Sequence, residues 1–518
     1  MKTIPILLLL ASFIVGVTLA HAEPARHLPR EVLLDKIRGA WAGQMIGVVY
    51  GAPTEFKSLG KIIEGEIKGS ALATVVGQDD LYVEMTFAQV MDTIGLDATT
   101  ADYGEAFKNS KYELWHANAG ARRNLNRGIA APMSGHPKYS IHSDDIDFQI
   151  EADFIGIMSP GLPQTANQFA DRVGRVMNHG DGLYGGMFVS GMYAAAYFES
   201  DPRKVVEAGL ACIPAGSPYG QLIADVLAWS AQEPGDWRKT WQKVEEKWNK
   251  DDVCPDGAFR AFNIDAKLNG SYIAIGLLFG GSDWQQTMEI ATRCGQDSDC
   301  NPSSALGVLG AMIGYDNIPA HHQAELARIA DLKFSFTDYS FNDIVKSTEA
   351  RALAVIRRAG GEVSETGVVI PFQPPVAPPL ELANFGVPVK VLWVGDAAWN
   401  WQGDWIEKEG NIWSDKIRIR VTEGAGSEAT LTFEGTGLAI AGDLSQDGGR
   451  ADVYLDGVKS DLIADAHILP KTHDNDLWRM HGLKPGPHTL RLVMRDDADP
   501  RSKGRKIMIS RAVVYQEK

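Results

Sequence analysis

The chain has 518 residues, 45% of them hydrophobic, so it is long enough to form two or more domains with large buried cores. Its 66 acidic and 50 basic residues leave a formal charge of −16, which would repel a phosphate backbone and excludes nucleic acid as an expected partner. Four cysteines are too few for a disulfide-built scaffold, although pairing of Cys294 with Cys300 is open at this stage.

Residues 1–22 have the features of a secretory signal peptide. Lys2 stands near the start, an apolar stretch follows, and the segment ends in Ala20-His21-Ala22. We expect cleavage after Ala22 and a secreted or periplasmic protein. No later stretch is apolar over the roughly 20 residues that a membrane helix needs. The mature chain is therefore expected to have no membrane partner.

Residues 23–365 carry a helical pattern of apolar residues, with few strand signals. Pro29 reads as a first-turn residue of the first helix, and every fourth position from Gly39 to Gly51 is glycine. Glycines at this spacing share one helix face, where a second backbone can approach closely. The pattern predicts an all-α domain over this part of the chain.

The pattern changes after the helical part. Residues 366–385 are expected to form a proline-rich linker, because the stretch 366–388 carries six prolines. From 386 to 518 the apolar period is two, in segments such as "ATLTFEG" and "ADVYLDG", with "DG" and "KPGPH" as turn signals. The sequence therefore predicts a multidomain protein with an all-β sandwich as its C-terminal domain.

The segment "GQDSDCNP" gathers two aspartates, Asp297 and Asp299, before a helix expected to begin at the Asn-Pro step. Asn301 would cap that helix, so the two aspartates exceed what capping requires. A second surplus occurs in "GQDDLYVEM", where Asp79 and Asp80 adjoin the start of another expected helix. These two acidic pairs call for an explanation other than helix capping.

A fifth carboxylate, Glu55, closes the loop "YGAPTEF". Two carboxylates ~4 Å apart repel by roughly 4 kcal/mol at an effective dielectric near 20. No Lys or Arg stands within three residues of the four aspartates. Divalent ions held by hard oxygen ligands would offset this charge. The spacing also leaves an alternative open, in which these acids lie in solvated loops and do not come together in the fold.

Four motifs resemble the ADP-ribosylglycohydrolase family in their order and spacing: "RGAWAGQMIGVVYGAPTEF", "GQDDLYVEM", "NHGDGLYGGMFVSGMYAAA" and "GQDSDCNPSSALGVLGAMIGY". The resemblance covers about residues 30–355 and implies a compact all-α fold that binds two magnesium ions. It also implies four metal ligands and one acid beside the substrate, namely Asp79, Asp80, Asp297, Asp299 and Glu55.

This sequence departs from the family pattern at three positions. Gln78 and Cys300 replace the threonines of the two acid blocks, and Val48 replaces an aspartate. The amide oxygen of Gln78 can still coordinate a hard ion, whereas a neutral thiol is a poor magnesium ligand. We therefore expect a divalent metal cofactor, Mg²⁺ in one or two sites, with Ca²⁺ or Mn²⁺ as alternatives.

Other residues are candidates for contacting the substrate. The segment "DFQIEADFIGIMSPG" is the best match to the family's glycine-rich phosphate loop, and it carries Glu151 and Asp153. These acids disfavour a diphosphate and favour an uncharged sugar. The turn "NHGDG" adds His179 and Asp181, with a capped helix entry as the alternative, and Asn118 is a further candidate.

The β part, roughly residues 386–518, resembles the galactose-binding-like jelly-roll modules of secreted carbohydrate enzymes. A Gly-Thr-Gly turn and a Val-Tyr-Leu-Asp-Gly hairpin carry this likeness. Trp399, Trp401 and Trp405 stand close together in it. Their rings could stack on sugars or pack in the core.

These features together predict an exported, divalent-metal-dependent glycoside hydrolase with a carbohydrate substrate. It would cleave an O- or N-glycosidic bond of a sugar with vicinal hydroxyls, a furanoside in a glycan. Glu55, Asp80 and Asp297 are the expected catalytic residues, and their separation would decide between retention and inversion. One alternative is an ADP-ribosyl hydrolase acting on ADP-ribosylated protein or ADP-ribose derivatives. Another is a catalytically inactive, metal-stabilised glycan-binding protein.

Overall fold

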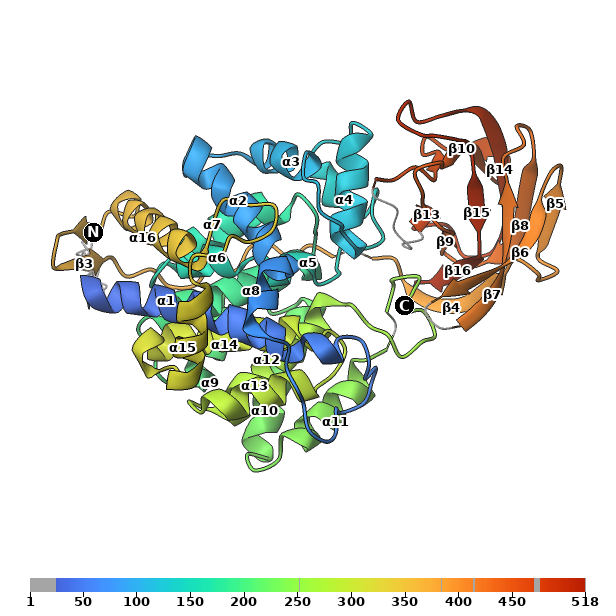
Figure 1. Cartoon of the computed structure of the whole chain (residues 1–518). Coiled ribbons are helices and arrows are strands. Elements are labelled where there is room, and N and C mark those ends of the chain that lie inside the picture. Colours follow the sequence, from blue (N-terminus) through green and yellow to red (C-terminus); the bar gives the residue numbers. More distant parts are fainter. Residues whose placement is uncertain (1–24, 251, 383, 413–414, 470–475, 518) are drawn as a thin grey trace, which may run out of the picture.

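The computed structural model describes residues 25–250, 252–382, 384–412, 415–469 and 476–517. The expected signal segment, residues 1–22, lies outside these ranges. Figure 1 shows the helices gathered in one body and most of the strands in a second body beside it. The expected fold class, an all-α domain followed by an all-β domain, is confirmed. None of the helices in the described ranges has the length and apolar character of a membrane span.

The described part of the helical body contains these α-helices: α1 (Arg30–Gly51), α2 (Asp79–Ile94), α3 (Thr100–Lys108), α4 (His116–Asn126), α5 (Asp147–Ile150), α6 (Asp153–Ile157), α7 (Pro163–Gly174), α8 (Asp181–Ala196), α9 (Pro202–Leu210), α10 (Pro218–Gln232), α11 (Trp237–Lys247), α12 (Ala266–Gly280), α13 (Trp284–Arg293), α14 (Cys300–Ile313), α15 (Ala320–Ile329) and α16 (Phe341–Arg358). Short 3₁₀ turns connect them: η1 (Ala52–Thr54), η2 (Leu72–Gly77), η3 (Met133–Gly135) and η4 (Tyr315–Asn317).

A small antiparallel sheet ties the two ends of the helical body together. It is built from β1 (Arg26–Pro29), β3 (Gly367–Ile370) and β2 (Glu362–Val363), in that order. Pro29 ends β1 and caps α1 with a φ of −58°, so it precedes the helix instead of lying in its first turn. Strand β3 falls inside the expected linker, and the domain limits at 365 and 385 stay a prediction.

Helices α1 and α14 cross with their backbones in direct contact, as the glycine spacing predicts. A Cβ atom on Gly43 would lie 2.1 Å from the carbonyl oxygen of Leu306, and one on Gly51 would lie 2.0 Å from that of Ser298. Any side chain at these positions would collide with backbone atoms. The contact therefore places the loop before α14 beside the loop that follows α1.

The start of α14 differs from the expectation. The helix begins at Cys300 and Asp299 occupies its N-cap, so Asn301 lies in the first turn. The amide of Asn301 instead donates to Asn269 Oδ1 at 3.1 Å. The side chain of Asp299 makes no capping hydrogen bond. Asn301 is therefore not the cap of α14. The side chain of Asp299 is nevertheless free of any capping role, as expected.

The proline-rich segment lies along α7 and α8. Tyr184 on α8 donates its hydroxyl to the carbonyl oxygen of Pro379 at 3.1 Å, and Asn167 on α7 donates to that of Val376 at 3.1 Å. Between β3 and β4, the described residues have no regular secondary structure. This segment therefore crosses the helical body in an extended form before the second domain begins.

The β body consists of antiparallel sheets in the described part of the chain. Its sheet orders are β11-β10-β14-β8-β5 with β12 beside β10, β13-β9-β16-β4, and β15-β7-β6. The strands are β4 (Val387–Trp393), β5 (Trp399–Gln402), β6 (Ile406–Ile412), β7 (Asp415–Thr422), β8 (Glu428–Glu434), β9 (Gly437–Ala441), β10 (Gly449–Leu455), β11 (Val458–Lys459), β12 (Ala464–Asp465), β13 (Asp476–Met480), β14 (Pro487–Ala498), β15 (Ile507–Ile509) and β16 (Arg511–Gln516).

The three neighbouring tryptophans of the β domain pack against each other. The rings of Trp399 and Trp401 stack with centroids 4.9 Å apart, and Trp405 meets Trp401 edge-on at 4.8 Å. Each indole N–H donates to a backbone carbonyl of the same domain, at 2.9 to 3.2 Å. Because the polar edge of each ring is already bonded within the domain, these contacts favour the structural reading over the sugar-stacking one.

Two segments of the helical body hold the β domain. In the loop 252–258, the carbonyl of Val253 accepts from Tyr515 at 2.7 Å and that of Pro255 accepts from Arg511 at 2.8 Å. Helix α4 and its C-cap contribute arginines that donate to backbone carbonyls of the β domain: Arg122 and Arg123 in the helix, and Arg127 at the cap. The loop 252–258 and α4 therefore form the main described polar contacts between the domains.

Candidate metal and active site

Two loops meet where α1 ends and α14 begins. Glu55 follows η1, and the hydroxyls of Thr54 and Ser298 lie 2.8 Å apart. The backbone N–H of Phe56 donates to the carbonyl of Gln296 at 3.0 Å. These bonds, together with the glycine contact of the two helices, place Glu55 next to the 297–299 loop.

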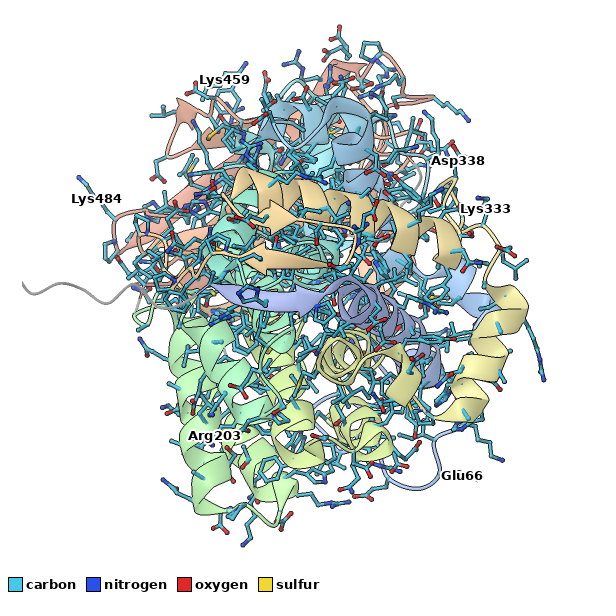
Figure 2. The ribbon with its side chains drawn as sticks, turned by 90° about the vertical axis from the view of Figure 1, so that its left-hand side faces the viewer. Glu66, Arg203, Lys333, Asp338, Lys459 and Lys484 are labelled. Atoms are coloured by element: carbon cyan, nitrogen blue, oxygen red, sulfur yellow. The ribbon has the colours of Figure 1, made fainter. Side chains whose placement is uncertain are left out.

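Three of the four aspartates of this site are buried, unlike ordinary surface acids, and Asp79 is half-buried. Asp80 is 1% exposed, and Asp297 and Asp299 are each 3% exposed. By contrast, Glu66 and Asp338 lie at the surface of the molecule (Figure 2). Burial of an unpaired carboxylate is costly, so these aspartates require a compensating proton or cation.

The α2 aspartates reach the same place from another direction. Asp79 and Asp80 are the first two residues of α2, and the thiol of Cys300 donates to Asp80 Oδ2 at 3.4 Å. The Cys300 sulfur also lies within 4.8 Å of carboxylate oxygens of Asp297 and Asp299, so the thiol joins the two acidic pairs. Both Cys300 and Cys294 are free thiols, so the disulfide that the sequence left open is not formed.

The electrostatic effects on the aspartates agree with this convergence. Burial raises the pKa of Asp80 well above its usual range, and the charges of Asp79 and Asp299 raise it further. Burial also raises the pKa of Asp299, to about 6, with Asp79 adding to the effect. For Asp297 the pKa is raised by burial and then by Asp299 and Glu55. Charges that perturb one another in this way share one site.

Glu55 stands at the open rim of the cluster. The surrounding protein raises its pKa to about 8, and the nearby carboxylates of Asp299 and Asp79 contribute to the rise. Its side chain is solvent-exposed, so water screens part of this rise in pKa. Glu55 is therefore the most exposed acid of the group, and its raised pKa favours the protonated form.

The cluster has the donor set that a hard divalent cation prefers. None of its five carboxylates, on Glu55, Asp79, Asp80, Asp297 and Asp299, forms an ion pair with a described Lys, Arg or His. Buried oxygen atoms on three of the aspartates lack hydrogen-bond partners: Asp80 Oδ1, Asp297 Oδ1 and Asp299 Oδ1. Mg²⁺, Mn²⁺ and Ca²⁺ bind such oxygens, so the residues fit the expected metal. Gln78 is half-buried just before α2, and its role as a metal ligand stays a prediction.

Glu84 is a cluster neighbour that the sequence reasoning missed. It lies one helical turn after Asp80, is fully buried, and accepts a hydrogen bond from the backbone N–H of Phe154 at 2.9 Å. Burial and the charges of Asp153 and Asp80 raise its pKa. The i,i+4 spacing from Asp80, which puts both acids on one helix face, was the signal that could have found it.

Asn118 and Glu151 lie beside the cluster. The amide of Asn118 donates to Glu151 Oε1. Burial raises the pKa of Glu151, and Asp147, Asp79 and Asp80 add to the rise. Both candidates are therefore within electrostatic reach of the α2 aspartates.

Asp153 occupies a layer behind these residues. It accepts a hydrogen bond from the Tyr193 hydroxyl at 2.6 Å and one from Ser304 at 3.5 Å. The charge of Asp153 is also the largest charge effect on Glu84. The oxygens of Asp153 thus accept hydrogen bonds from α8 and α14 on the interior side of the acid cluster.

His179 and Asp181 have described contacts away from the acid cluster. His179 Nδ1 lies 3.3 Å from Glu381 Oε2 in the extended segment, and Asp181 accepts from the backbone N–H of Tyr219 at 3.2 Å. Lys267 and Asp144 are the charges that influence Asp181 most. The substrate-binding roles of these two residues stay predictions.

Strained backbone residues surround the site. Phe56, Gln296 and Phe336 have positive φ angles of 49°, 54° and 61°, which side-chain-bearing residues rarely adopt. Phe56 adjoins Glu55, and Gln296 adjoins Asp297. The ring of Phe336 packs edge-on against Tyr82 of α2 at 5.2 Å. Such strain concentrates at binding and catalytic sites, which supports a functional reading of the cluster.

The acid cluster should make the stability of the metal-free protein depend on pH. Its carboxyls hold protons in the folded state at pH values where the unfolded chain, with pKa values near 3.8 to 4.5, has released them. The free energy of unfolding of the chelated protein should therefore fall as pH rises from about 4 towards 8. Melting curves with and without Mg²⁺ would check this, because added metal should remove the decline. A chelated protein that gains stability over this range would contradict the expectation.

The helical body and its buried carboxylate cluster together define a hydrolase-type domain with a candidate divalent-metal centre. The family model "ADP-ribosylglycohydrolase" matches residues 29–352. The chain belongs to this family.

Other similarities are more limited. The "A type blood alpha-D-galactosamine galactosaminidase" of Flavonifractor plautii is 38% identical over 92 residues, which is 18% of this chain and 8% of that protein. A solved "ADP-ribosylglycohydrolase-related protein complex" matches 63% of this chain and 99% of its own, at 17% identity and a TM-score of 0.37. A two-domain esterase active on acetylated mannans matches 34% of this chain and 46% of its own, at 14% identity and a TM-score of 0.20.

Proposed function

We propose that the protein is an exported, divalent-metal-dependent glycoside hydrolase. It would cleave an O- or N-glycosidic bond of a sugar with vicinal hydroxyls, a furanoside in a glycan. One observation carries the proposal: the carboxyls of Glu55, Asp79, Asp80, Asp297 and Asp299 share one site without a described basic partner. Family membership and the relative named as a galactosaminidase support it.

A bound divalent cation would neutralise the aspartates and supply a Lewis acid that orients two neighbouring sugar hydroxyls. Glu55, at the open rim, can give its proton to the departing oxygen or nitrogen as the glycosidic bond breaks. Asp297 or Asp80, each with an unpartnered Oδ1, can accept the proton that water loses as its oxygen bonds to the anomeric carbon. Glu55 loses one proton and the aspartate gains one. Proton exchange with solvent then returns both carboxyls to their starting state.

The charges around the site favour an uncharged substrate. Glu84 and Glu151 place two further acids next to Asp79 and Asp80, so any proton that they release adds to the negative charge of the cluster. A diphosphate would be repelled unless the metal neutralised all of this charge. The ring of Phe336, which is 61% exposed beside Tyr82, offers an apolar face of the kind on which sugar rings stack. A neutral glycan therefore suits the surroundings better than ADP-ribose does.

Truncating the exposed ring should weaken substrate binding more than chemistry. Phe336→Ala is expected to raise KM about tenfold with little change in kcat, because stacking is retained equally in the ground and transition states. Leu332→Ala is the matched control, since Leu332 is an exposed apolar residue of the same segment, at 47%. Steady-state kinetics on an active glycoside would check this. Equal effects of the two substitutions would remove Phe336 from the site.

ADP-ribosyl hydrolysis is the competing activity, because the matching family bears that name. A catalytically inactive glycan-binding protein is the third possibility, motivated by the thiol of Cys300 where the family pattern has threonine. Turnover of an ADP-ribosylated peptide without turnover of glycosides would support the first. Measurable glycan affinity without turnover, unchanged in Glu55→Ala, would support the second.

The deciding experiment is a screen of aryl furanosides and pyranosides with and without a chelator. We expect turnover of a furanoside that chelation removes and that Mg²⁺ or Mn²⁺ restores. Glu55→Gln should lower kcat by about 10² to 10⁴, as expected for loss of a general acid. The loss should be smallest for aglycones that leave readily, because these need least protonation. Activity that survives chelation would contradict the metal-dependent mechanism.

A further inference from the structure

A second group of metal-binding side chains lies outside the acid cluster. It consists of His116, His142, Asp145 and Cys254, and one ligand atom from each lies within 4.8 Å of the others. His116 is the first residue of α4, and Cys254 belongs to the loop 252–258. The other two residues lie in the turn before α5. Three segments that are distant in the chain therefore bring two nitrogens, one sulfur and one oxygen to a single point.

We propose that these four residues bind a divalent ion of the Zn²⁺ class, and that this ion fastens the loop holding the β domain to the helical domain. Tetrahedral zinc sites place neighbouring ligand atoms about 3.3 to 3.8 Å apart, as bond lengths near 2.0 Å for nitrogen and 2.3 Å for sulfur require. His116 Nδ1 lies 3.6 Å from Asp145 Oδ2, within this range, whereas His142 Nδ1 is hydrogen-bonded to the same oxygen at 2.8 Å and would exchange that bond for the ion. Small side-chain movements would therefore complete the coordination.

The donor set separates this group from the acid cluster. Imidazole and thiolate ligands prefer borderline-soft ions such as Zn²⁺, whereas carboxylates alone prefer Mg²⁺, Ca²⁺ and Mn²⁺. His142, Asp145 and Cys254 are fully buried, and His116 is half-buried. A Cys-His-Asp arrangement can also form a nucleophilic triad. The complete burial of Cys254 leaves no path for a substrate to its sulfur, so the metal reading is the stronger one.

The charge around the group favours a bound cation. Asp144 and Asp265 also converge on Asp145, with ligand oxygens within 4.8 Å of one another. Lys267 forms an ion pair with Asp265. Among the described residues, it is the lysine or arginine that pairs with one of these three aspartates. Buried oxygens on three residues have no hydrogen-bond partner among the described residues: Asp144 Oδ1, Asp145 Oδ1 and Asp265 Oδ1. One lysine leaves a buried excess of carboxylates, which a divalent ion would offset.

The location gives the ion its structural role. Val253 and Pro255, on either side of Cys254, are the residues whose carbonyls accept from Tyr515 and Arg511 of the β domain. His116 begins α4, whose arginines also contact the β domain, and it has a strained φ of 42°. A metal bound between His116 and Cys254 would lock both docking segments in place. It would also fix α4, which carries Asn118 beside Glu151 at the acid cluster.

The test measures metal in the full chain, without reference to activity. Purified wild-type protein is expected to retain about one zinc per chain after dialysis against Mg²⁺. Replacing zinc by Co²⁺ should give intense tetrahedral d–d bands and a thiolate-to-cobalt charge-transfer band in the near ultraviolet. Cys254→Ser should abolish the charge-transfer band, and His116→Gln should weaken binding at least tenfold. Cys212→Ser is the matched control, because Cys212 is also a buried free thiol but lies outside the group. Asp297→Ala should keep the zinc.

Several outcomes would overturn the proposal. One is a wild-type cobalt spectrum without a thiolate band, which needs no variant and so does not depend on folding. Others are a band that persists in Cys254→Ser, or zinc that is lost with Asp297→Ala instead of with His116→Gln. Hydrogen exchange in residues 252–258 should increase when zinc is removed. Unchanged exchange there would refute the fastening role while leaving the proposed hydrolase unaffected.

Discussion

The Asp299→Asn variant is expected to lose about 10³-fold in kcat while its metal-free form melts above metal-free wild-type protein. Asp299 is buried, the charge of Asp79 raises its pKa, and the charge of Asp299 in turn raises the pKa of Asp297. Removing one negative charge relieves repulsion in the absence of metal, so we expect an increase in Tm of roughly 2 °C. The same change removes a ligand, so Mg²⁺ should no longer stabilise the fold.

Asp461→Asn is the control for this prediction, because Asp461 is an exposed aspartate of the β domain. It should leave kcat, the metal-free Tm and the response to Mg²⁺ unchanged. The opposite signs of the stability and activity effects distinguish a metal ligand from an aspartate that merely supports the fold. A metal-free Asp299→Asn protein that melts lower than wild type, yet still responds to Mg²⁺, would show that the carboxylate is structural.

Gly43→Ala is expected to destabilise the protein by about 3 kcal/mol or more, at the upper end of the cost of overpacking. An exposed helical glycine normally gains stability on replacement by alanine. Here the new Cβ would lie 2.1 Å from the carbonyl oxygen of Leu306, so α1 and α14 must separate. Because Asp299 immediately precedes α14 and Glu55 follows α1, the separation should also disturb the acid cluster and reduce metal affinity.

Thermal or urea unfolding of the two proteins measures this effect. Gly235→Ala provides the control, since an added Cβ there meets no atom within 4 Å. The control should change stability by less than about 1 kcal/mol. A Gly43→Ala protein that is as stable as the control would mean that the helix contact is looser than the structure indicates.

The helix contact and the convergence of the acids illustrate what the sequence makes predictable. Glycine at every fourth position, from Gly39 to Gly51, is a local pattern with one physical reading, and the structure confirms the close backbone approach. The surplus aspartates were recognisable because helix capping does not use them. Their convergence depended on the resemblance, since nothing local relates Asp80 to Asp299.

The start of α14 and the second metal-binding group illustrate the limits. Asn301 resembles a cap because Asn before Pro is a common helix start, but the helix begins two residues earlier than that cap would place it. The side chain of Asn301 bonds Asn269 instead. The second group joins His116, His142 and Cys254 through irregular loops that have no periodic pattern. Only the tertiary packing of the loop 252–258 against α4 and the turn before α5 brings these ligands together.

The most direct test of the central claim is a crystal structure of the protein soaked in Mn²⁺, with anomalous difference density used to locate the ion. We predict a strong anomalous peak within bonding distance, about 2.0 to 2.4 Å, of carboxylate oxygens from both Asp79 or Asp80 and Asp297 or Asp299. A map with no peak among these four aspartates, with their carboxyls turned towards hydrogen-bond donors of the protein, would contradict the account.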